Sequence, residues 1–138
     1  MASVRDVLYL LLAGGQSRRM GGGDKNLRDL CGKPLLGHVI TRAVPDDAIA
    51  LINANGDAAR YEAFGLPVIS DVVEGFAGPL AGVLTGLEWA VANQPSCSHV
   101  ISLATDAPFL PQNLGSALIA AIDDGVELAY AQSNDRRH

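Results

Sequence analysis

Cysteine is scarce in this sequence, and long apolar runs are missing from it. Cys31 and Cys97 are the only cysteines among 138 residues, and neither lies in a CxxC or other zinc-like spacing. We therefore expect two unpaired thiols rather than a disulfide or a zinc site. No run reaches the roughly 20 apolar residues that a membrane-spanning helix needs, and the first six residues lack the layout of a signal peptide. These absences predict a cytoplasmic protein that does not enter a membrane.

Basic residues are few but unevenly distributed. The formal net charge is −5, and Lys and Arg together number ten, so a general nucleic-acid binder is not expected. Six of the ten lie within the first 33 positions: Arg5, Arg18, Arg19, Lys25, Arg28 and Lys33. Cations gathered in one short stretch of an acidic protein predict a local site for an anion.

What the chain does have is a regular alternation of apolar runs and helical patterns. Strands are predicted at 7–12, 48–53, 66–70, 99–104 and 127–131, and helices at 34–44, 58–64, 79–93 and 111–123. In the helix at 79–93, the apolar side chains of Leu80, Val83, Leu84, Leu87 and Ala90 or Val91 are expected to face the core. The alternation predicts one α/β domain over residues 1–138, with a mostly parallel sheet covered by helices on both faces.

The stretch from Leu12 to Lys25 follows the first apolar run and is rich in glycine and basic residues. Ligands of open α/β sheets bind at the carboxyl ends of strands, where this loop begins. Glycines let backbone N–H groups approach an anion, and Arg18, Arg19 and Lys25 supply positive charge. The loop matches neither the Walker pattern nor the dinucleotide fingerprint. A loop that only turns the chain is the alternative, but it would not need three cations.

Polar residues also end the other predicted strands. Asn53, Asp71 and Asp106 follow the second, third and fourth strands. By position alone Asp106 is equally a helix cap or a ligand of Mg²⁺, which binds one or two carboxylates together with substrate phosphates. The cationic loop at the neighbouring strand end favours the metal. The tight Gly78–Gly82 helix entry either approaches a ligand or lets helix and sheet pack closely, and the sequence leaves both open.

In this order and spacing, the motifs resemble those of the molybdenum cofactor guanylyltransferase family, a branch of the nucleotidyltransferases. The matching pieces are Leu12-Ala13-Gly14-Gly15, Arg18-Arg19-Met20-Gly21, Asp24-Lys25, Gly32-Lys33-Pro34-Leu35, Asn53-Ala54-Asn55, Asp71, Gly78-Pro79-Leu80-Ala81-Gly82 and Asp106-Ala107-Pro108. The resemblance implies a Rossmann-like, three-layer α/β/α nucleotidyltransferase fold. Members of the family usually continue well past the motif matched at 135–138, which implies that the C-terminal part of the fold is missing here.

The resemblance also implies a reaction and its site. GMP would pass from GTP to the phosphate of molybdenum-molybdopterin with Mg²⁺, releasing pyrophosphate, and other enzymes of cofactor biosynthesis or recipient enzymes would be partners. The positions that match the family's GTP site are Leu12, Ala13, Gly14, Lys25, Asn53, Asp71 and Asp106. Asp106 matches the Mg²⁺ ligand. Gly14 favours guanine, because the sister enzymes that use CTP tend to have alanine there.

Phosphoryl transfer develops negative charge on the phosphates. We therefore expect Arg19 and Lys25 to hold the triphosphate and, together with Asp106, to be catalytic. Three alternatives stay open. One is a related cytidylyltransferase or sugar-1-phosphate nucleotidyltransferase. Another is a GTP-binding module without catalysis, which the implied missing C-terminal part would favour. The third is a purely structural α/β domain with no affinity for nucleotides.

Overall fold

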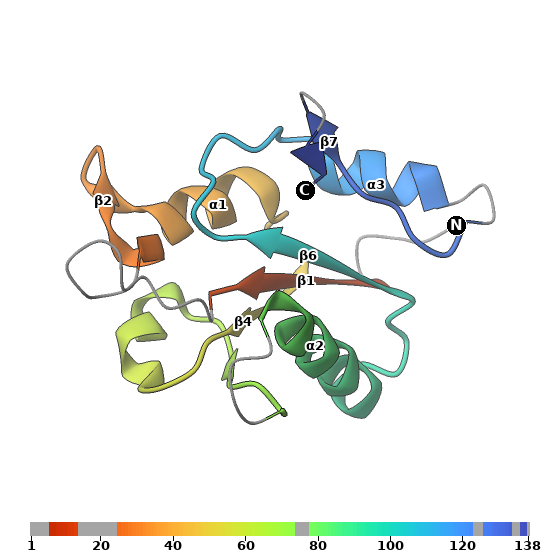
Figure 1. Cartoon of the computed structure of the whole chain (residues 1–138), viewed down its shortest axis with the longest axis horizontal. Helices are drawn as coiled ribbons and strands as arrows, with labels where there is room; N and C mark the ends of the chain where they lie inside the picture. Colours follow the sequence, from red (N-terminus) through yellow and green to blue (C-terminus); the bar gives the residue numbers. More distant parts are fainter. Residues whose placement is uncertain (1–5, 14–24, 74–77, 123–125, 134–135, 138) are drawn as a thin grey trace.

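The computed structural model describes residues 6–13, 25–73, 78–122, 126–133 and 136–137. Its centre is a parallel sheet of four strands in the order β5-β4-β1-β6. The strands are β1 (Val7–Leu12), β4 (Ile49–Asn53), β5 (Val68–Ile69) and β6 (His99–Ala104). Three α-helices pack on the sheet: α1 (Leu35–Ala43), α2 (Pro79–Asn93) and α3 (Leu114–Ile122). Figure 1 shows α1 and α3 on one face and α2 on the other, the three layers that the sequence predicted.

Strand β1 is central because its side chains are apolar on both faces. Val7, Tyr9 and Leu11 face the cluster that includes Leu36 and Val39 of α1. Leu8 and Leu10 belong to a second cluster on the other face, which includes Leu51 of β4 and Ala90 of α2. All five of these β1 residues are at most 2% exposed. The core therefore has two halves divided by the sheet, and β1 belongs to both.

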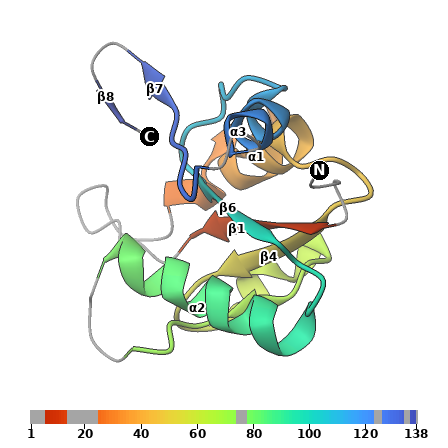
Figure 2. The ribbon, with the colours of Figure 1, turned by 90° about the vertical axis from the view of Figure 1, so that its right-hand side faces the viewer.

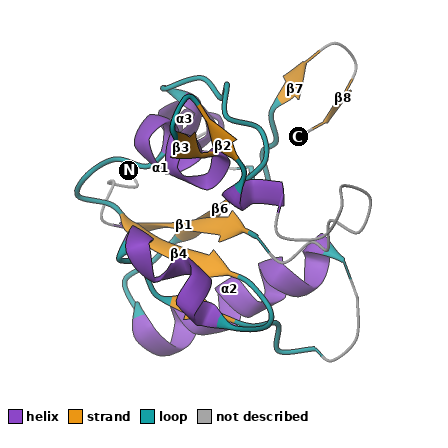
Figure 3. Cartoon of the chain, turned by 90° about the vertical axis from the view of Figure 1, so that its left-hand side faces the viewer, coloured by secondary structure: helices purple, strands orange, loops and turns teal. Residues whose placement is uncertain are grey.

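Short elements fill the connections. A 3₁₀ turn η3 (Lys25–Leu27) leads into an antiparallel hairpin of β2 (Asp29–Leu30) and β3 (Lys33–Pro34), beside the start of α1 (Figure 3). The sequence predicted only a loop here. Another 3₁₀ segment, η4 (Ala58–Phe64), replaces the helix predicted at 58–64, and Gly65 ends it with a φ of 68°. Glycine suits that position because it adopts a left-handed backbone without a steric cost.

The fifth predicted strand, 127–131, is wrong. Residues 126–131 contain no strand. They are followed by two short strands that pair antiparallel, β7 (Gln132–Ser133) and β8 (Arg136–Arg137). This hairpin forms a sheet of its own, away from the central one (Figure 2). Leu128 is 78% exposed. A strand is stabilised by packing on one or both of its faces, and a side chain this exposed has no such surface to cover.

Helix α2 has the predicted bounds, but its leucines do not face the core as expected. Leu80, Leu84 and Leu87 are all more than 40% exposed, whereas Ala90, expected in the core as the alternative to Val91, is buried. The residues that it buries are small: Ala81, Gly82, Thr85, Gly86 and Ala90. At Gly86 an added Cβ would come within 2.6 Å of Leu10 Cδ2. The helix lies so close to the sheet that only small residues fit at the points of closest approach, and its leucines therefore point outward.

Candidate nucleotide-binding site

The described residues among those predicted to bind the nucleotide lie along the carboxyl edge of the sheet. Leu12 is level with Asn53 of β4 on one side and with Ala104 of β6 on the other. The chain adds β4 and β5 on one side of β1 and then crosses to add β6 on the other. In open α/β sheets, ligands bind at the point where the strand order reverses in this way, outside the carboxyl ends of the strands. That point lies between β1 and β6.

Lys25 and Asp106 meet beside this point. Lys25 Nζ lies 3.1 Å from Asp106 Oδ2, and the two side chains are 50% and 43% exposed. Lys25 begins η3, and Asp106 lies two residues after β6. The pair brings a cation suited to a phosphate next to a carboxylate suited to a metal, and both remain accessible to a ligand. Such a pair can engage an anion through the ammonium and a cation through the carboxylate.

Asn53 and Asp71 form a second group on the other side of β1. Asn53 Nδ2 donates to Asp71 Oδ1 over 2.8 Å, and Asn55 Nδ2 donates to Asp71 Oδ2 over 3.0 Å. The backbone N–H of Asp71 in turn donates to Asn55 Oδ1 over 2.9 Å. Both oxygens of the carboxylate thus accept a hydrogen bond, so the segment after β5 is held firmly against the end of β4. Asn55 was part of the recognised motif but was not predicted as a site residue.

The end of β1 joins the two groups. The backbone N–H of Ala13 donates to the Asn53 carbonyl over 2.8 Å. On the other side, the Leu12 carbonyl accepts from Thr105 Oγ1 over 2.9 Å. Leu12 and Ala13 thus lie between the two groups, with Ala13 hydrogen-bonded to Asn53 and Leu12 to Thr105, the neighbour of Asp106 in the chain.

The structure decides the role of Gly82 in the tight helix entry. A Cβ atom at Gly82 would overlap the side-chain oxygen of Asn53 and come within 2.8 Å of Leu12 Cδ2. Gly82 therefore lets α2 pack on two predicted site residues, which favours the packing interpretation over direct contact with a ligand. Behind it, Thr85 Oγ1 donates to the Ala81 carbonyl and accepts from the N–H of Val72, which follows Asp71. Helix α2 thus holds the segment after Asp71 through the hydrogen bond between Thr85 and Val72.

Two predicted site residues, Gly14 and Arg19, lie outside the described residues, as does Arg18. Sequence reasoning also missed Asn26 and Thr105, which are buried and joined by a hydrogen bond. Each of them is next to a predicted site residue in the chain, which could have pointed to it. Asn and Thr are common in ordinary turns, however, so neither residue stands out in the sequence.

Asp106 is the described residue best placed to hold a metal ion. Its carboxylate is accessible and already faces a cation, the Lys25 ammonium. Within the described segments, no three or more His, Cys, Asp or Glu side chains gather as a metal site. A single carboxylate fits Mg²⁺, which binds through one or two carboxylates and completes its shell with water and substrate phosphates.

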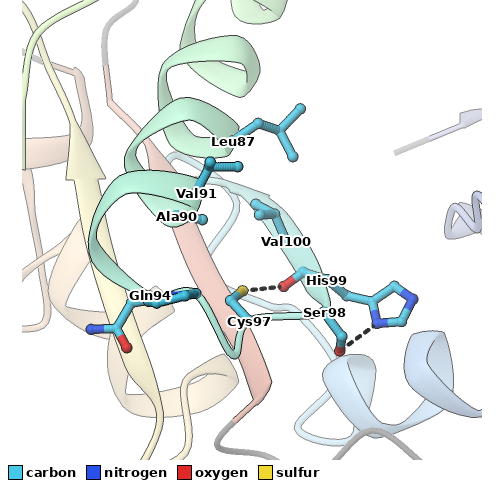
Figure 4. Close-up of a pocket in the computed structure, with 9 residues that line it drawn as sticks. Leu87, Ala90, Val91, Gln94, Cys97, Ser98, His99 and Val100 are labelled. Carbon is cyan, nitrogen blue, oxygen red and sulfur yellow. Dashed lines mark hydrogen bonds between the residues drawn. The ribbon is translucent and has the colours of Figure 1, made fainter.

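The surface hollow shown in Figure 4 is a different feature. Leu87, Val91, Cys97 and His99 contribute to its lining, between the C-terminal half of α2 and the start of β6. Two hydrogen bonds lie within its lining: Cys97 Sγ donates to the His99 carbonyl, and Ser98 Oγ bonds His99 Nδ1. It lies at the amino end of β6, opposite the edge that carries Asp106. It therefore does not belong to the candidate site.

Both cysteines are free, as expected.

In the described segments, no helix is both long enough and apolar enough to cross a membrane.

Comparisons with known proteins agree with the fold and the motifs. The family model for the MobA-like NTP transferase domain matches residues 9–138. A molybdenum cofactor guanylyltransferase of Mesorhizobium japonicum is 53% identical over 135 residues, which are 97% of this chain and 64% of that protein. The chain spans 61 to 64% of the length of the curated relatives that head the comparison.

Solved structures of low sequence identity share the fold. That of molybdopterin-guanine dinucleotide biosynthesis protein A from Archaeoglobus fulgidus has a TM-score of 0.66 at 21% identity, covering 95% of this chain and 63% of that one. That of Rv0371c from Mycobacterium tuberculosis H37Rv, in complex with manganese, has a TM-score of 0.60 at 19% identity, covering 88% and 61%. The family predicted from the motifs is confirmed: this chain belongs to the MobA-like NTP transferase domain family.

Proposed function

We propose that this chain is the GTP-binding part of a guanylyltransferase that transfers GMP from GTP to the phosphate of molybdenum-molybdopterin and releases pyrophosphate. The observation that carries the proposal is the Lys25–Asp106 pair, 3.1 Å apart at the point where the strand order reverses. A relative of that name at 53% identity supports the choice of substrates.

In the proposed reaction, an oxygen of the acceptor phosphate attacks the α-phosphorus of GTP. The bond from the α-phosphorus to the bridging oxygen breaks, and pyrophosphate leaves with that oxygen. Lys25 contributes by holding the triphosphate and neutralising the negative charge that develops on the leaving group. Arg19, predicted for the same role, and Gly14, predicted to favour guanine, retain these roles as proposals.

Mg²⁺ is the proposed cofactor, and Asp106 would hold it. When bound, the ion would supply positive charge beside the phosphates. Asn53 and Asp71, with Leu12 and Ala13, would form the wall of the nucleotide site. Their hydrogen-bonded arrangement supports this role, because a wall that is already rigid loses little entropy when the ligand binds.

The partners and location are proposals of the same kind. They are molybdenum-molybdopterin as acceptor, other enzymes of cofactor biosynthesis or the recipient enzymes, and a place in the cytoplasm without nucleic acid or membrane.

The test is incubation of the chain with molybdopterin, molybdate, GTP and Mg²⁺, followed by detection of the guanine dinucleotide product. Lys25→Ala should lower the rate by about a hundredfold or more, comparable to loss of one donor to a developing oxyanion, about 3 kcal/mol. Lys25→Arg keeps the charge and should retain more activity. Turnover of Lys25→Ala within a few-fold of the parent chain would contradict the role of Lys25, and preference for CTP over GTP would favour the cytidylyltransferase alternative.

A second candidate is a GTP-binding module that does not catalyse transfer. Such a module would bind GTP with Mg²⁺ but release no pyrophosphate with any acceptor.

A further inference from the structure

A buried link runs beside the exposed Lys25–Asp106 pair. Asn26 follows Lys25 in the chain and Thr105 precedes Asp106, and Asn26 Nδ2 donates to Thr105 Oγ1 over 3.2 Å. Asn26 and Thr105 are 5% and 4% exposed, whereas Lys25 and Asp106 are 50% and 43% exposed. The same two segments are therefore joined twice, once in the interior and once at the surface.

The Thr105 hydroxyl is the centre of this link. It accepts from Asn26 and donates to the Leu12 carbonyl over 2.9 Å, so its one proton and an acceptor site are both used. It thereby connects the end of β6 to the end of β1 and to η3. A further contact comes from η4, where the Tyr61 hydroxyl donates to Asn26 Oδ1 over 3.4 Å. Tyr61 is fully buried.

The two links differ in what they can hold. An exposed ion pair between a long lysine and a carboxylate contributes little net free energy and opens readily in water. A buried hydrogen bond is costly to break, because its groups would lose their partners away from water. The interior link therefore fixes the backbone positions of Lys25 and Asp106. The ion pair between their side chains can still open, so that each charged group can bind a ligand instead.

We propose that Asn26 and Thr105 are positioning residues of the nucleotide site. They hold the backbone at Lys25 and Asp106 in register, so that one triphosphate with its metal ion meets both side chains at once. The inference rests on the proposed GTP and Mg²⁺ binding and assigns the alignment of that site to residues that do not touch the ligand themselves.

The experiment is a calorimetric titration of the 138-residue chain and its variants with GTP and Mg²⁺, with thermal unfolding measured on the same samples. Thr105→Val keeps the shape and removes the hydroxyl, and it should weaken binding about tenfold, the equivalent of one to two lost hydrogen bonds. Thr105→Ser restores the hydroxyl and should bind within about threefold of the parent chain. Val7→Ala, at the buried amino end of β1, is the control that lowers stability away from the site and should leave affinity unchanged.

A double-mutant cycle tests whether Thr105 acts through the charged pair. In a Lys25→Ala background, Thr105→Val should reduce the affinity clearly less than it does alone, because one of the two groups that it aligns is already missing. Full additivity of the two losses would overturn the positioning role. If Thr105→Val does not fold, Asn26→Ala removes the same hydrogen bond from the other side and takes its place in the cycle.

The outcomes separate the two proposals. If the parent chain does not bind GTP with Mg²⁺, the proposed function fails and the inference fails with it. If the parent chain binds but Thr105→Val binds equally well while its melting temperature falls, only the positioning role is overturned and the link is purely structural.

Discussion

Gly82 of α2 lies so close to Asn53 of β4 that one added methyl group would overlap the side-chain oxygen of Asn53. The helix that covers one face of the sheet therefore also packs against the candidate site. Asn53 holds Asp71 by a hydrogen bond of 2.8 Å, so a larger side chain at position 82 would displace two predicted binding residues.

This relationship predicts that Gly82→Ala impairs binding beyond its effect on stability. The substitution should cost about 1–3 kcal/mol of unfolding free energy by overpacking and weaken GTP binding about tenfold or more. Gly86→Ala is the matched control, because its Cβ would meet the side chain of Leu10 in the core instead. Urea denaturation and nucleotide titration of both variants check this, and equal affinity for the two would contradict it.

The Lys25–Asp106 ion pair should matter little for stability. Because both side chains are about half exposed, water screens their attraction, and the double variant Lys25→Met/Asp106→Asn should change the unfolding free energy by less than about 1 kcal/mol. Its GTP affinity should nevertheless fall sharply. Denaturation and titration on one preparation give both numbers, and a stability loss above about 2 kcal/mol would show that the pair is structural.

Asp71→Asn should destabilise the chain. An amide in place of the carboxylate puts an N–H₂ donor against the donating amide of Asn53 or Asn55, which leaves a hydrogen bond unmade and costs about 1–3 kcal/mol. Asp47→Asn, an exposed acid in the turn before β4, should stay within about 0.5 kcal/mol. Chemical denaturation decides, and equal stabilities of the two variants would mean that the Asp71 network contributes nothing measurable.

Stability should also fall in strong alkali because of Tyr9. Desolvation by burial raises the pKa of Tyr9 above its ordinary value of 10.0. Below pH 10 the phenol is protonated in both states; above it the unfolded chain loses the proton first, so unfolding becomes more favourable as pH rises toward the folded pKa. Tyr9→Phe should flatten this decline. Denaturation midpoints measured from pH 8 to 11 check this. An equal decline of the midpoint with pH in the parent chain and in Tyr9→Phe would contradict the prediction.

Comparison of sequence and structure shows which patterns were informative. The runs at 7–12 and 99–104 became strands with those bounds, because an apolar run bounded by turn residues is a strong local signal. Asn53, Asp71 and Asp106 were correctly expected at one edge, since parallel strands end there together. The predicted core face of α2 was wrong at its leucines, because apolar periodicity ranks Leu80 above Gly82, whereas the short distance between helix and sheet, set by tertiary packing, selects small residues.

The strand predicted at 127–131 failed for a related reason. Alternation of Leu128 and Tyr130 with polar or small residues suits a strand, but both side chains are at least 50% exposed. Local composition does not reveal whether a neighbouring strand is available. Likewise, no periodicity marks the Asn26–Thr105 bond, whose partners are 79 positions apart.

The ion pair between Lys25 and Asp106 would couple the two proposed ligands, the nucleotide and the metal ion. A triphosphate that engaged Lys25 would release the carboxylate of Asp106 for a cation, and a cation on Asp106 would release the ammonium of Lys25 for an anion. By thermodynamic linkage, each ligand would then raise the affinity of the other by the same factor. The pair would therefore favour cooperative uptake of nucleotide and metal, and disfavour either one bound alone.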